Sequence, residues 1–225
     1  MSRRSLSCIV VLGALLTATA CGGGGGGNTQ FRVLQTSPDE NAVDVLLDGT
    51  SVASGVTYGT PTNYSSVSSG SHSLKVRPTG STANLIDEQI TLNSGSNSTL
   101  VVANFASSIT PILLADDTTA PASGDVKVRF LNVAPGLGNV DIYLVAPGST
   151  PGLVSATLQN LAFDTASGYQ SFSAGSYEFF VTAAGNTFSY VDSGSITFTA
   201  GQSVTLVALS NRVGGFTYVR LADLK

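Results

Sequence analysis

Hydrophobic and polar residues alternate along many short segments of this chain, which is the pattern of strands with one buried face. Leu74 and Val76 alternate with Lys75 and Arg77, and the segment 177–181 repeats this parity with aromatic residues. Turn-forming clusters of Ser, Gly and Asn separate such segments about every ten residues. No stretch beyond the N-terminal segment has a convincing helical period. We therefore predict an all-β fold of Ig-like or prealbumin-like antiparallel sandwiches, with seven or eight strands in each.

The same pattern occurs twice along the chain. Residues 31–45, "FRVLQTSPDENAVDV", match residues 128–142, "VRFLNVAPGLGNVDI", at a shift of 97. Further on, residues 56–76 match residues 161–181 at a shift of 105. The second copy therefore contains about eight extra residues, and "APGSTPG" at 146–152 is the predicted inserted loop.

This repeat predicts two tandem β-sandwich domains, at residues 31–115 and 125–225. Each is long enough to bury a core of its own. The segment 116–124, "DDTTAPASG", is rich in small residues and is interpreted as the linker. Asp48-Gly49 has the composition of a two-residue hairpin turn.

The N-terminal segment has the features of an export signal. Arg3 and Arg4 precede the apolar run 8–16, which is too short to span a bilayer. We interpret residues 1–20 as a signal peptide. Ala18 and Ala20 satisfy the A-x-A pattern of ordinary signal peptidase, which would release a soluble protein.

The alternative that we favour is a bacterial lipoprotein. "TATAC" resembles a loose lipobox, in which Cys21 would become the lipidated N-terminus. A run of six glycines, Gly22–Gly27, follows and has the composition of a flexible tether, so residues 21–30 are interpreted as a lipidated Cys and tether. With Cys21 lipidated and Cys8 removed, no thiol is left for a disulfide. Gly22 in place of Asp favours an outer-membrane anchor by resemblance to lipoprotein sorting.

Composition narrows the class of partner. Charged residues make up 11% of the chain, the formal net charge is −4, and no run of Lys or Arg occurs. Nucleic acid is therefore not an expected partner. We expect the N-terminal lipid to associate with the membrane, and the folded part to meet an envelope protein or a polysaccharide.

The repeated motif resembles the signature of a bacterial family called domain of unknown function 4397. The resemblance covers nearly all of the chain after the signal segment. It implies an all-β, exported, often lipidated and often tandem protein whose activity is not established. The matching residues of the first copy are Arg32, Ser37, Pro38, Asp39, Val43, Asp44, Val45, Asp48, Gly49, Tyr58, Gly59, Tyr64, Gly70, His72 and Leu74, and those of the second are Arg129, Pro135, Val140 and Asp141.

One position departs from the family pattern. Where the family usually has His, this chain has Gln35 in the first copy and Asn132 in the second. A carboxamide donates and accepts hydrogen bonds but does not titrate near neutral pH. We therefore predict a hydrogen-bonding role for Gln35 and Asn132 rather than proton transfer.

His72 is the single histidine of the chain, and so the one candidate for a His base. It shares the parity of Leu74 and Val76, and its counterpart in the second copy is Tyr177. We therefore interpret His72 as a structural residue at the edge of the core. A Ser hydrolase is poorly supported, because no G-x-S-x-G motif stands between a strand and a helix.

The best-matched acids of the repeat are Asp44 and Asp141. Each follows an Arg by 12 residues, Arg32 and Arg129 respectively. We predict a repeated Arg–Asp pair on neighbouring strands, Arg32 with Asp44 and Arg129 with Asp141. The Pro residues between them, Pro38 and Pro135, are expected to shape the bend between the first two strands of each domain.

A calcium site is the alternative use of these acids. Its ligands would come from Asp39, Glu40, Asp44 and Asp48. Calcium needs six to eight oxygens around one point, and the second copy lacks counterparts of Asp39 and Asp48, so we expect neither a metal site nor a cofactor. The remaining acids, Asp87, Glu88, Asp116 and Asp117, are expected to be solvated.

Outward-facing aromatic residues are the remaining candidates for a binding surface. Phe180 occupies the position that Lys75 holds in the first copy, and Tyr143 shares the parity of Asp141. Such rings stack on sugars or pack on a partner. The alternative, which we favour for this pair, is that the other domain covers them.

Three functions remain open. The first is a non-enzymatic lipoprotein that binds, scaffolds or adheres at the cell surface or in the periplasm, with no catalytic residues and an unidentified ligand site. The second is a carbohydrate-active enzyme that uses paired carboxylates. The third is a purely structural spacer.

Overall fold

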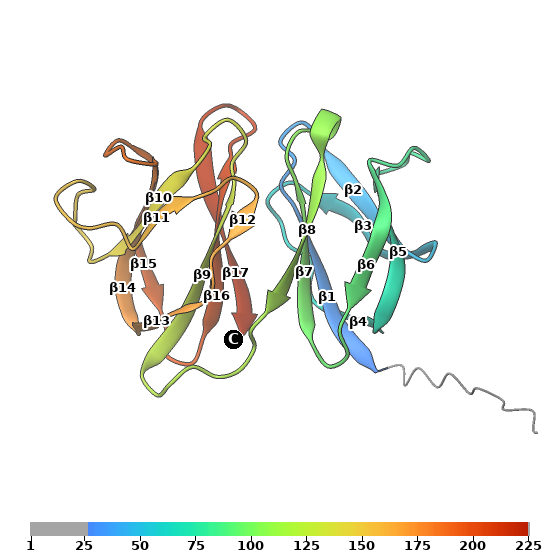
Figure 1. Ribbon diagram of the computed structural model, residues 1–225, viewed down its shortest axis with the longest axis horizontal. Coiled ribbons are helices and arrows are strands. Elements are labelled where there is room, and N and C mark those ends of the chain that lie inside the picture. The colour runs from blue at the N-terminus through green and yellow to red at the C-terminus, as the bar shows by residue number, and fades with distance from the viewer. Residues whose placement is uncertain (1–26, 225) are drawn as a thin grey trace, which may run out of the picture.

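The computed structural model describes residues 27–224 of the chain. The signal segment, Cys21 and the Gly run up to residue 26 lie outside the described residues. No helix in the described part is long and apolar enough to cross a membrane. Within residues 27–224, seventeen strands and one short 3-10 helix form two β-sandwiches that lie side by side (Figure 1), so the all-β prediction is confirmed.

The first domain contains eight strands in two sheets. One sheet has the order β4-β1-β7-β8 and the other has the order β3-β2-β5-β6. The elements are β1 (Asn28–Gln35), β2 (Ala42–Leu47), β3 (Thr50–Thr57), β4 (Ser65–Ser68), β5 (Gly70–Pro78), β6 (Ile86–Leu92), β7 (Asn97–Ala103), η1 (Ala106–Ser108) and β8 (Thr110–Asp116).

The second domain repeats this arrangement with nine strands. Its sheets have the orders β12-β9-β16-β17, with β13 also paired to β9, and β11-β10-β14-β15. The elements are β9 (Asp125–Val133), β10 (Val140–Val145), β11 (Leu158–Leu161), β12 (Thr165–Ala166), β13 (Gln170–Ser173), β14 (Gly175–Ala183), β15 (Ser189–Phe198), β16 (Ser203–Ser210) and β17 (Phe216–Leu224).

Strand pairing is antiparallel as predicted, with one exception in each domain. The first strand of each copy pairs in parallel with the strand that precedes the last one, β1 with β7 and β9 with β16. These central strands are buried on both faces, as the burial of every residue of β16 shows. Their runs of consecutive apolar residues follow from this double burial.

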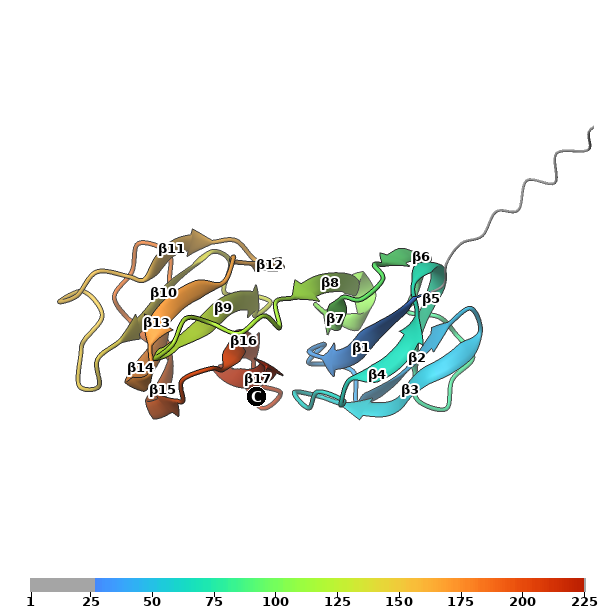
Figure 2. The same ribbon diagram turned by 90° about the horizontal axis from the view of Figure 1, so that it is seen from below.

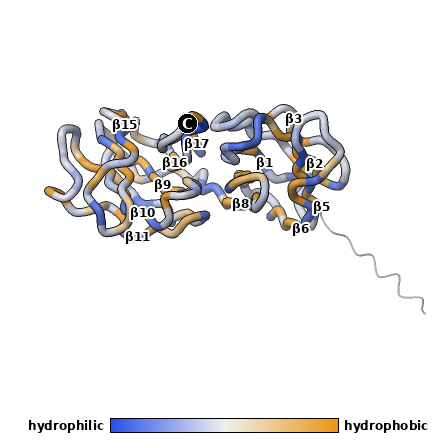
Figure 3. The backbone as a smooth tube through the Cα atoms, turned by 90° about the horizontal axis from the view of Figure 1, so that it is seen from above, coloured by the Kyte–Doolittle hydropathy of each residue, from blue (hydrophilic) through white to orange (hydrophobic). Residues whose placement is uncertain are grey.

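Alternation directs the side chains of β1 to two different places. Phe31 and Val33 point into the core between the two sheets of the first domain. The intervening Arg32 and Leu34 point away from that core and are also buried. Hydrophobic stretches are found along the strands of both domains (Figure 3). The face of this sheet that points away from the core is therefore buried as well.

The predicted hairpin and the inserted loop are both present. Asp48 and Gly49 have φ of 50° and 80° and join β2 to β3 with Leu47 opposite Thr50. Positive φ at both central residues is the requirement of a type I′ turn, which Asp-Gly meets at low cost. The insertion forms the long connection between β10 and β11, where the Gly148 amide donates to Glu178 Oε2 at 2.7 Å.

The borders of the folded parts differ slightly from the predicted ones. The predicted tether extends to residue 30, but β1 already begins at Asn28. The predicted linker begins at Asp116, but this residue ends β8 and is buried. The connection to β9 therefore comprises residues 117–124, and it passes between the domains where they lie side by side (Figure 2).

Candidate functional site at the domain interface

The two domains meet through one sheet each. The sheet with β1, β7 and β8 faces the sheet with β9, β16 and β17 (Figure 1). The apolar part of this contact is a single cluster with matched contributions from both copies. Its buried members are Leu34, Val101, Ala103 and Leu114 from the first domain, and Leu131, Val133, Val207, Leu209 and Leu221 from the second.

Arg32 crosses the interface from the first domain. Its Nε donates to Thr99 Oγ1 at 2.7 Å within the same domain. Its Nη1 donates to the Ala222 carbonyl at 2.8 Å, and its Nη2 pairs with the Asp223 carboxylate, both in β17 of the second domain. The guanidinium lies 4.5 Å from the ring centre of Tyr64. All three nitrogens of the guanidinium therefore have partners.

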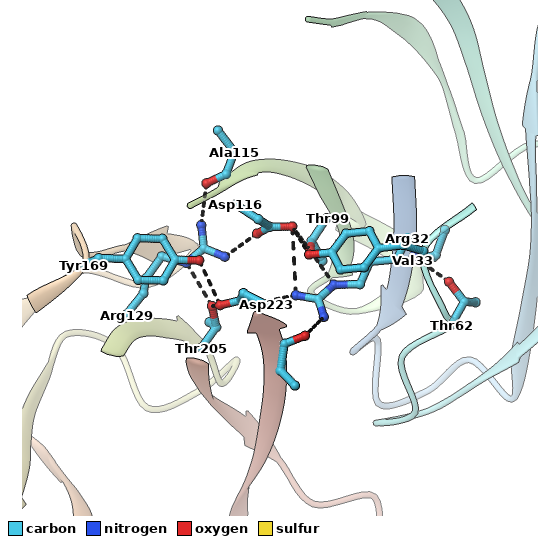
Figure 4. Close-up of polar contacts among 12 residues, drawn as sticks. Arg32, Val33, Thr62, Thr99, Ala115, Asp116, Arg129, Tyr169, Thr205 and Asp223 are labelled. Atoms are coloured by element: carbon cyan, nitrogen blue, oxygen red, sulfur yellow. Dashed lines mark hydrogen bonds and ion pairs between the residues drawn. The ribbon is translucent and has the colours of Figure 1, made fainter. Parts of the chain in front are cut away.

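Arg129 makes the same contacts in the opposite direction. Its Nε donates to Thr205 Oγ1 at 3.0 Å. Its Nη1 donates to the Ala115 carbonyl at 2.9 Å and its Nη2 to Asp116 Oδ1 at 2.5 Å, both in β8 of the first domain. The guanidinium lies 4.7 Å from the ring centre of Tyr169. The contacts of Arg129 thus repeat those of Arg32 with the roles of the two domains exchanged, as in an approximate two-fold symmetric interface (Figure 4).

Each of the two carboxylates, Asp116 and Asp223, completes its half of the network. Both side chains are fully buried. Burial raises the pKa of Asp223, against the lowering effect of the positive charge of Arg32. Two guanidinium groups face two carboxylates, so the network is balanced in charge. Each carboxylate also accepts from one Thr and one Tyr: Thr99 at 2.5 Å and Tyr64 at 2.6 Å for Asp116, and Thr205 at 2.7 Å and Tyr169 at 2.8 Å for Asp223.

The predicted pairs of Arg32 with Asp44 and of Arg129 with Asp141 are wrong. Each Arg lies in the interface sheet of its domain, whereas Asp44 and Asp141 lie in β2 and β10 of the opposite sheet. The hydrogen-bonded carboxylate of each Arg comes from the other domain, and Arg32 also lies 3.9 Å from Asp116 Oδ2 of its own domain. The constant spacing of 12 residues instead reflects two strands that follow one another in both copies.

Asp44 accepts one hydrogen bond from the edge strand β3 and one from the connection after β5. Its Oδ1 accepts from the Gly55 amide at 2.8 Å and from Thr79 Oγ1 at 2.9 Å. The hydrogen bond from Gly55 is the main reason that the pKa of Asp44 is lowered. Asp44 therefore holds the bulged strand β3 in place.

Asp141 has the corresponding role in the second domain. Its two oxygens accept from the Asn160 and Gly185 amides, both at 2.8 Å. Asn160 corresponds to Gly55 at a shift of 105, and both residues have positive φ, 57° and 63°. Asp44 and Asp141 are thus equivalent structural residues of the repeat.

Gln35 and Asn132 form hydrogen bonds as predicted. Both are fully buried. Gln35 Nε2 donates to the carbonyls of Ser37 at 3.2 Å and Glu40 at 2.9 Å. Asn132 Nδ2 donates to the carbonyl of Gly138 at 2.8 Å. Each carboxamide therefore holds the loop that follows the first strand of its domain.

His72 is buried on the face of Leu74 and Val76, as predicted. Its Nδ1 lies 2.7 Å from Asp48 Oδ2 and its Nε2 lies 2.9 Å from the Ser68 carbonyl oxygen. A carbonyl only accepts hydrogen bonds, so Nε2 carries a proton and has no lone pair to activate a Ser hydroxyl.

Tyr177, the counterpart of His72 in the second domain, donates its hydroxyl to the Ser173 carbonyl at 2.8 Å. Ser173 corresponds to Ser68 at the same shift of 105. The same bond made by two different side chains supports the structural interpretation of His72.

The acids proposed as calcium ligands are used separately. Asp39 accepts from Ser37 Oγ at 3.0 Å and from the Ala106 amide at 2.9 Å. Asp48 binds His72 and the Ser73 amide, and the hydrogen bond from His72 is the main cause of its lowered pKa. Within residues 27–224, no group of three or more His, Cys, Asp or Glu side chains converges on a point that a metal ion would occupy.

Tyr143 and Phe180 are opposite each other on β10 and β14 and are both buried. The expectation that the first domain covers them is wrong, because their sheet is not the interface sheet. The inserted loop lies along this side of the second domain, where Gly148 contacts Glu178 and Gly152 approaches Thr187.

A groove of about 520 Å³ opens where the interface ends among loops. We call it the loop-end groove. Both domains line it, with the loops after β1, β7 and β9 and the loop between β16 and β17. The lining residues are Pro38, Asp39, Phe105, Pro135, Ser210, Asn211, Arg212, Gly214, Gly215 and Phe216.

Contacts between the domains hold the polar side of this groove. Arg212 Nη2 donates to Asn41 Oδ1 at 2.6 Å, and its guanidinium lies 5.8 Å from the ring centre of Tyr58. The Tyr58 hydroxyl donates to the Ser210 carbonyl, and burial raises the pKa of Tyr58 to about 12. Contacts from both domains therefore position the polar side of the groove.

An aromatic strip continues from the groove over the second domain. Phe216 packs edge to face on Tyr190, with ring centres 5.5 Å apart, and Tyr190 packs in the same way on Phe188 at 5.1 Å. Phe188 is 65% exposed and Tyr190 is 39% exposed. Phe105 on the first-domain side is 43% exposed. Apolar rings thus remain open to a ligand along one continuous surface.

The interface partners in the last strand of each domain were missed at the level of sequence. Leu114-Ala115-Asp116 and Leu221-Ala222-Asp223 repeat the tripeptide "LAD" at a shift of 107. This repeated tripeptide was the sequence signal that could have identified the two Asp residues as equivalent. Asp116, which we expected to be solvated in the linker, is instead an interface residue because β8 continues through it.

Fold and site together define a tandem β-sandwich protein with a polar, two-fold-related domain interface. Residues 29–143 and 153–225 match the family model described as Domain of unknown function (DUF4397). The chain therefore belongs to this family, and the resemblance found in the repeated motif is confirmed. Comparison with curated protein sequences finds no match.

Solved structures with detectable likeness include carbohydrate-binding modules. One is a family CBM26 module from Eubacterium rectale in complex with maltoheptaose, at 14% identity over 87% of this chain and 95% of that chain, with a TM-score of 0.26. Another is a streptococcal virulence factor described by its α-glucan binding, at 14% identity over 82% and 94%, with a TM-score of 0.25. A third is the Bacillus anthracis TIE protein, at 9% identity over 85% and 34%, with a TM-score of 0.26. At these scores the likeness assigns no ligand to this chain.

Proposed function

We propose that this protein is a non-enzymatic binding module of the bacterial cell envelope, and that it binds a polysaccharide strand along the loop-end groove and the aromatic strip. The observation that carries the proposal is the composition of this surface. Open aromatic rings lie beside a fixed carboxylate, a carboxamide and a guanidinium, those of Asp39, Asn211 and Arg212. A sugar ring has apolar C–H faces for such rings and hydroxyls for such planar polar groups.

The length of the surface favours a polymer over a single sugar. From the groove, the rings of Phe216, Tyr190 and Phe188 follow one another with centres 5.1–5.5 Å apart. The residues of the groove come from two domains and four connections, so the surface exists only while the domains are held together. This gives the buried Arg–Asp network a functional purpose, since it fixes both walls of the groove.

The position of the groove suits a protein anchored by its N-terminus. β1 begins at Asn28, next to the proposed tether, and Pro38 follows its other end. A strand of eight residues spans roughly 25 Å, so the groove lies at the end of the first domain that is far from the tether. With Cys21 lipidated, the groove would point away from the membrane.

The four acids that the repeat and the interface single out do not favour the alternative of a glycan hydrolase. Such an enzyme needs two carboxyl groups about 5–10 Å apart in a cleft. Asp44 accepts from the Gly55 amide and Thr79, Asp141 accepts from two backbone amides of the other domain, and Asp116 and Asp223 are fully buried and hydrogen-bonded. Asp116 and Asp223 are therefore closed to a sugar ring, and Asp44 and Asp141 lie in different domains and do not form a pair.

Binding to a panel of soluble and insoluble polysaccharides tests the proposal, by affinity electrophoresis and calorimetry. For the polysaccharide that binds, we expect Phe188→Ala and Tyr190→Ala each to weaken affinity about tenfold, which corresponds to about 1.4 kcal/mol. Glu88→Ala is the control, because Glu88 is exposed on β6, in the sheet of the first domain that does not face the second domain. Equal loss in the control, or no binding to any polysaccharide, would refute this site.

Fatty-acid labelling tests the proposed anchor separately. We expect cells that express the full chain to label the protein and cells that express Cys21→Ala to leave it unlabelled. Protease treatment of intact cells then reports which way the anchored protein faces. Labelling of neither form would show that ordinary signal peptidase releases a soluble protein.

A further inference from the structure

A second groove lies within the first domain, away from the interface. It has a volume of about 470 Å³ and opens between β4 and the start of β3, which are edge strands of opposite sheets. Five hydroxyl side chains surround it, those of Thr50, Ser51, Ser65, Ser66 and Ser68. We call it the hydroxyl-lined groove.

The floor of this groove is apolar. Val52 and Val67 line it and pack against the core of the first domain, and Leu47 beneath them is buried. The hydroxyl-bearing residues around the floor are exposed. The groove therefore offers an apolar base surrounded by groups that both donate and accept hydrogen bonds.

One wall of the groove is held rigidly by His72 and Asp48. The His72 ring joins the Asp48 carboxylate at 2.7 Å to the Ser68 carbonyl at 2.9 Å, so it ties the β2–β3 turn to β4 across the opening. Asp48 Oδ1 also accepts from the Ser73 amide at 2.8 Å. The Asp48 side chain is 58% exposed, so its oxygens remain accessible to a ligand in the groove.

Larger side chains occupy the same position in the second domain. Val67 corresponds to Phe172 and His72 corresponds to Tyr177, both at a shift of 105. The rings of Phe172 and Tyr177 pack edge to face with centres 6.0 Å apart, and Tyr177 packs on Phe198 at 5.9 Å. The groove thus results from smaller residues at positions where the second copy has aromatic rings.

We propose that the hydroxyl-lined groove is a binding site for a single neutral polyhydroxylated ring, of the size of a monosaccharide. Its volume lies in the range of small-molecule sites. The apolar base matches the C–H face of such a ring, and the surrounding hydroxyls and the carboxylate match its edge. The exposed carboxylate disfavours an anionic ligand. This site does not depend on the loop-end groove, which lies at the other end of β1.

Grafting between the two copies provides the test. The double variant Val67→Phe/His72→Tyr places in the first domain the pair that the second domain already accommodates. Glucose, galactose, mannose and N-acetylglucosamine are titrated into the two-domain chain, residues 27–225, and amide chemical shifts are followed by NMR. We expect saturable shifts at Ser66, Ser68 and His72 in the wild type, and at least tenfold weaker binding in the double variant.

Two further variants keep the test decisive. Thr50→Val/Ser66→Ala removes two exposed hydroxyls without enlarging any core residue, and we expect at least a tenfold loss here too. Phe188→Ala, which weakens the proposed polysaccharide surface, should leave monosaccharide binding in this groove unchanged. The proposal is overturned if none of the four sugars shifts these amides, or if both double variants bind like the wild type.

Discussion

The two domains share a fold but fill their cores differently. The first has one aromatic ring among its buried core residues, Phe31, and is otherwise aliphatic. The second buries Phe130, Phe179 and Phe198, and the first two of these rings stack with centres 6.2 Å apart and an angle of 4° between their planes. At the corresponding positions the first domain has Val33, Leu74 and Leu92.

The interface, in contrast, is built from the same residue types on both sides. Each domain contributes one Arg, one Thr, one Tyr and one Asp, at shifts between 97 and 107. Each of these side chains makes the same hydrogen bonds as its counterpart. The four pairs are Arg32 and Arg129, Thr99 and Thr205, Tyr64 and Tyr169, and Asp116 and Asp223.

The difference follows from where the partners of a residue lie. A core residue packs only within its own sandwich, and a change of volume is accommodated by neighbours from the same copy. Each interface Arg depends on a carboxylate from the other copy, so a change in either domain leaves a buried charge unpaired. The interface is thus the part of the repeat where the two copies constrain each other.

Separating the domains should have the largest effect. Residues 28–116 have their own core and also carry one complete set of interface groups. In a symmetric pair of first domains, Arg32 of each copy would meet Asp116 of the other. We therefore expect the isolated first domain to form a homodimer in sedimentation experiments. In the two-domain chain the same groups are already paired with the second domain, so we expect no such dimer. An isolated domain that stays monomeric would show that the two halves are not interchangeable.

Removing either interface Arg should destabilise the protein by about 3–5 kcal/mol, because a fully buried carboxylate loses its charged partner. Urea unfolding of Arg32→Ala and Arg129→Ala measures this, and the two values should agree within about 1 kcal/mol. Arg77→Ala is the control, because its hydrogen bond to Asn84 is exposed and its loss should cost about 0–1 kcal/mol. Clearly unequal values for the two interface variants would contradict the equivalence of the copies.

The fold and the repeat followed from the sequence, whereas the partners of the repeated residues did not. Alternation, the Asp-Gly turn and the constant shifts are local properties, so they predicted strands, a hairpin and two domains. The partner of Arg32 lies 191 residues away, in the last strand of the other copy. A search for partners confined to one copy selects Asp44, which is nearby in sequence but lies on the opposite sheet.

Strands that are buried on both faces were a sequence signal for the interface that the pattern of alternation does not capture. The run "STLVVA" and its counterpart "VTLVAL" are apolar on both parities, which a sheet with one solvated face does not need. Together with the repeated "LAD" tripeptide, they mark the sheet that the other domain covers. The loop-end groove had no comparable local signal, because Phe105 and Phe216 meet only through the docking of the two domains.

Truncating the two buried carboxamides should have an intermediate effect. Gln35→Ala and Asn132→Ala each remove two hydrogen bonds to backbone carbonyls, at an expected cost of about 1–3 kcal/mol in urea unfolding. Gln35→His keeps a ring donor and should lose less than Gln35→Ala. If Gln35→Ala is neutral, the loop after β1 does not depend on this carboxamide, and the first domain differs from the second at this point.

The smallest expected effect concerns an ion pair that only the second domain has. Lys127 Nζ donates to Asp117 Oδ2 at 2.6 Å where the linker enters β9, and the corresponding residue at the start of β1 is Gln30. The hydrogen bond from Lys127 is the main reason that the pKa of Asp117 is lowered to about 2. A lowered carboxyl pKa stabilises the fold above the ordinary value near 3.8 and loses this contribution as the pH falls through about 2.

Lys127→Gln makes this position resemble that of the first copy. We expect the pKa of Asp117, followed by carboxyl NMR titration, to rise toward its ordinary value in this variant, though the two hydrogen bonds from Thr119 hold it partly down. The free energy of unfolding should fall by about 0–1 kcal/mol at neutral pH, because the Asp117 side chain is 36% exposed and water screens the pair. The difference between variant and wild type should vanish between pH 4 and pH 2, as Asp117 is protonated. A difference that persists in acid would mean that Lys127 acts through packing at the start of β9 and not through its charge.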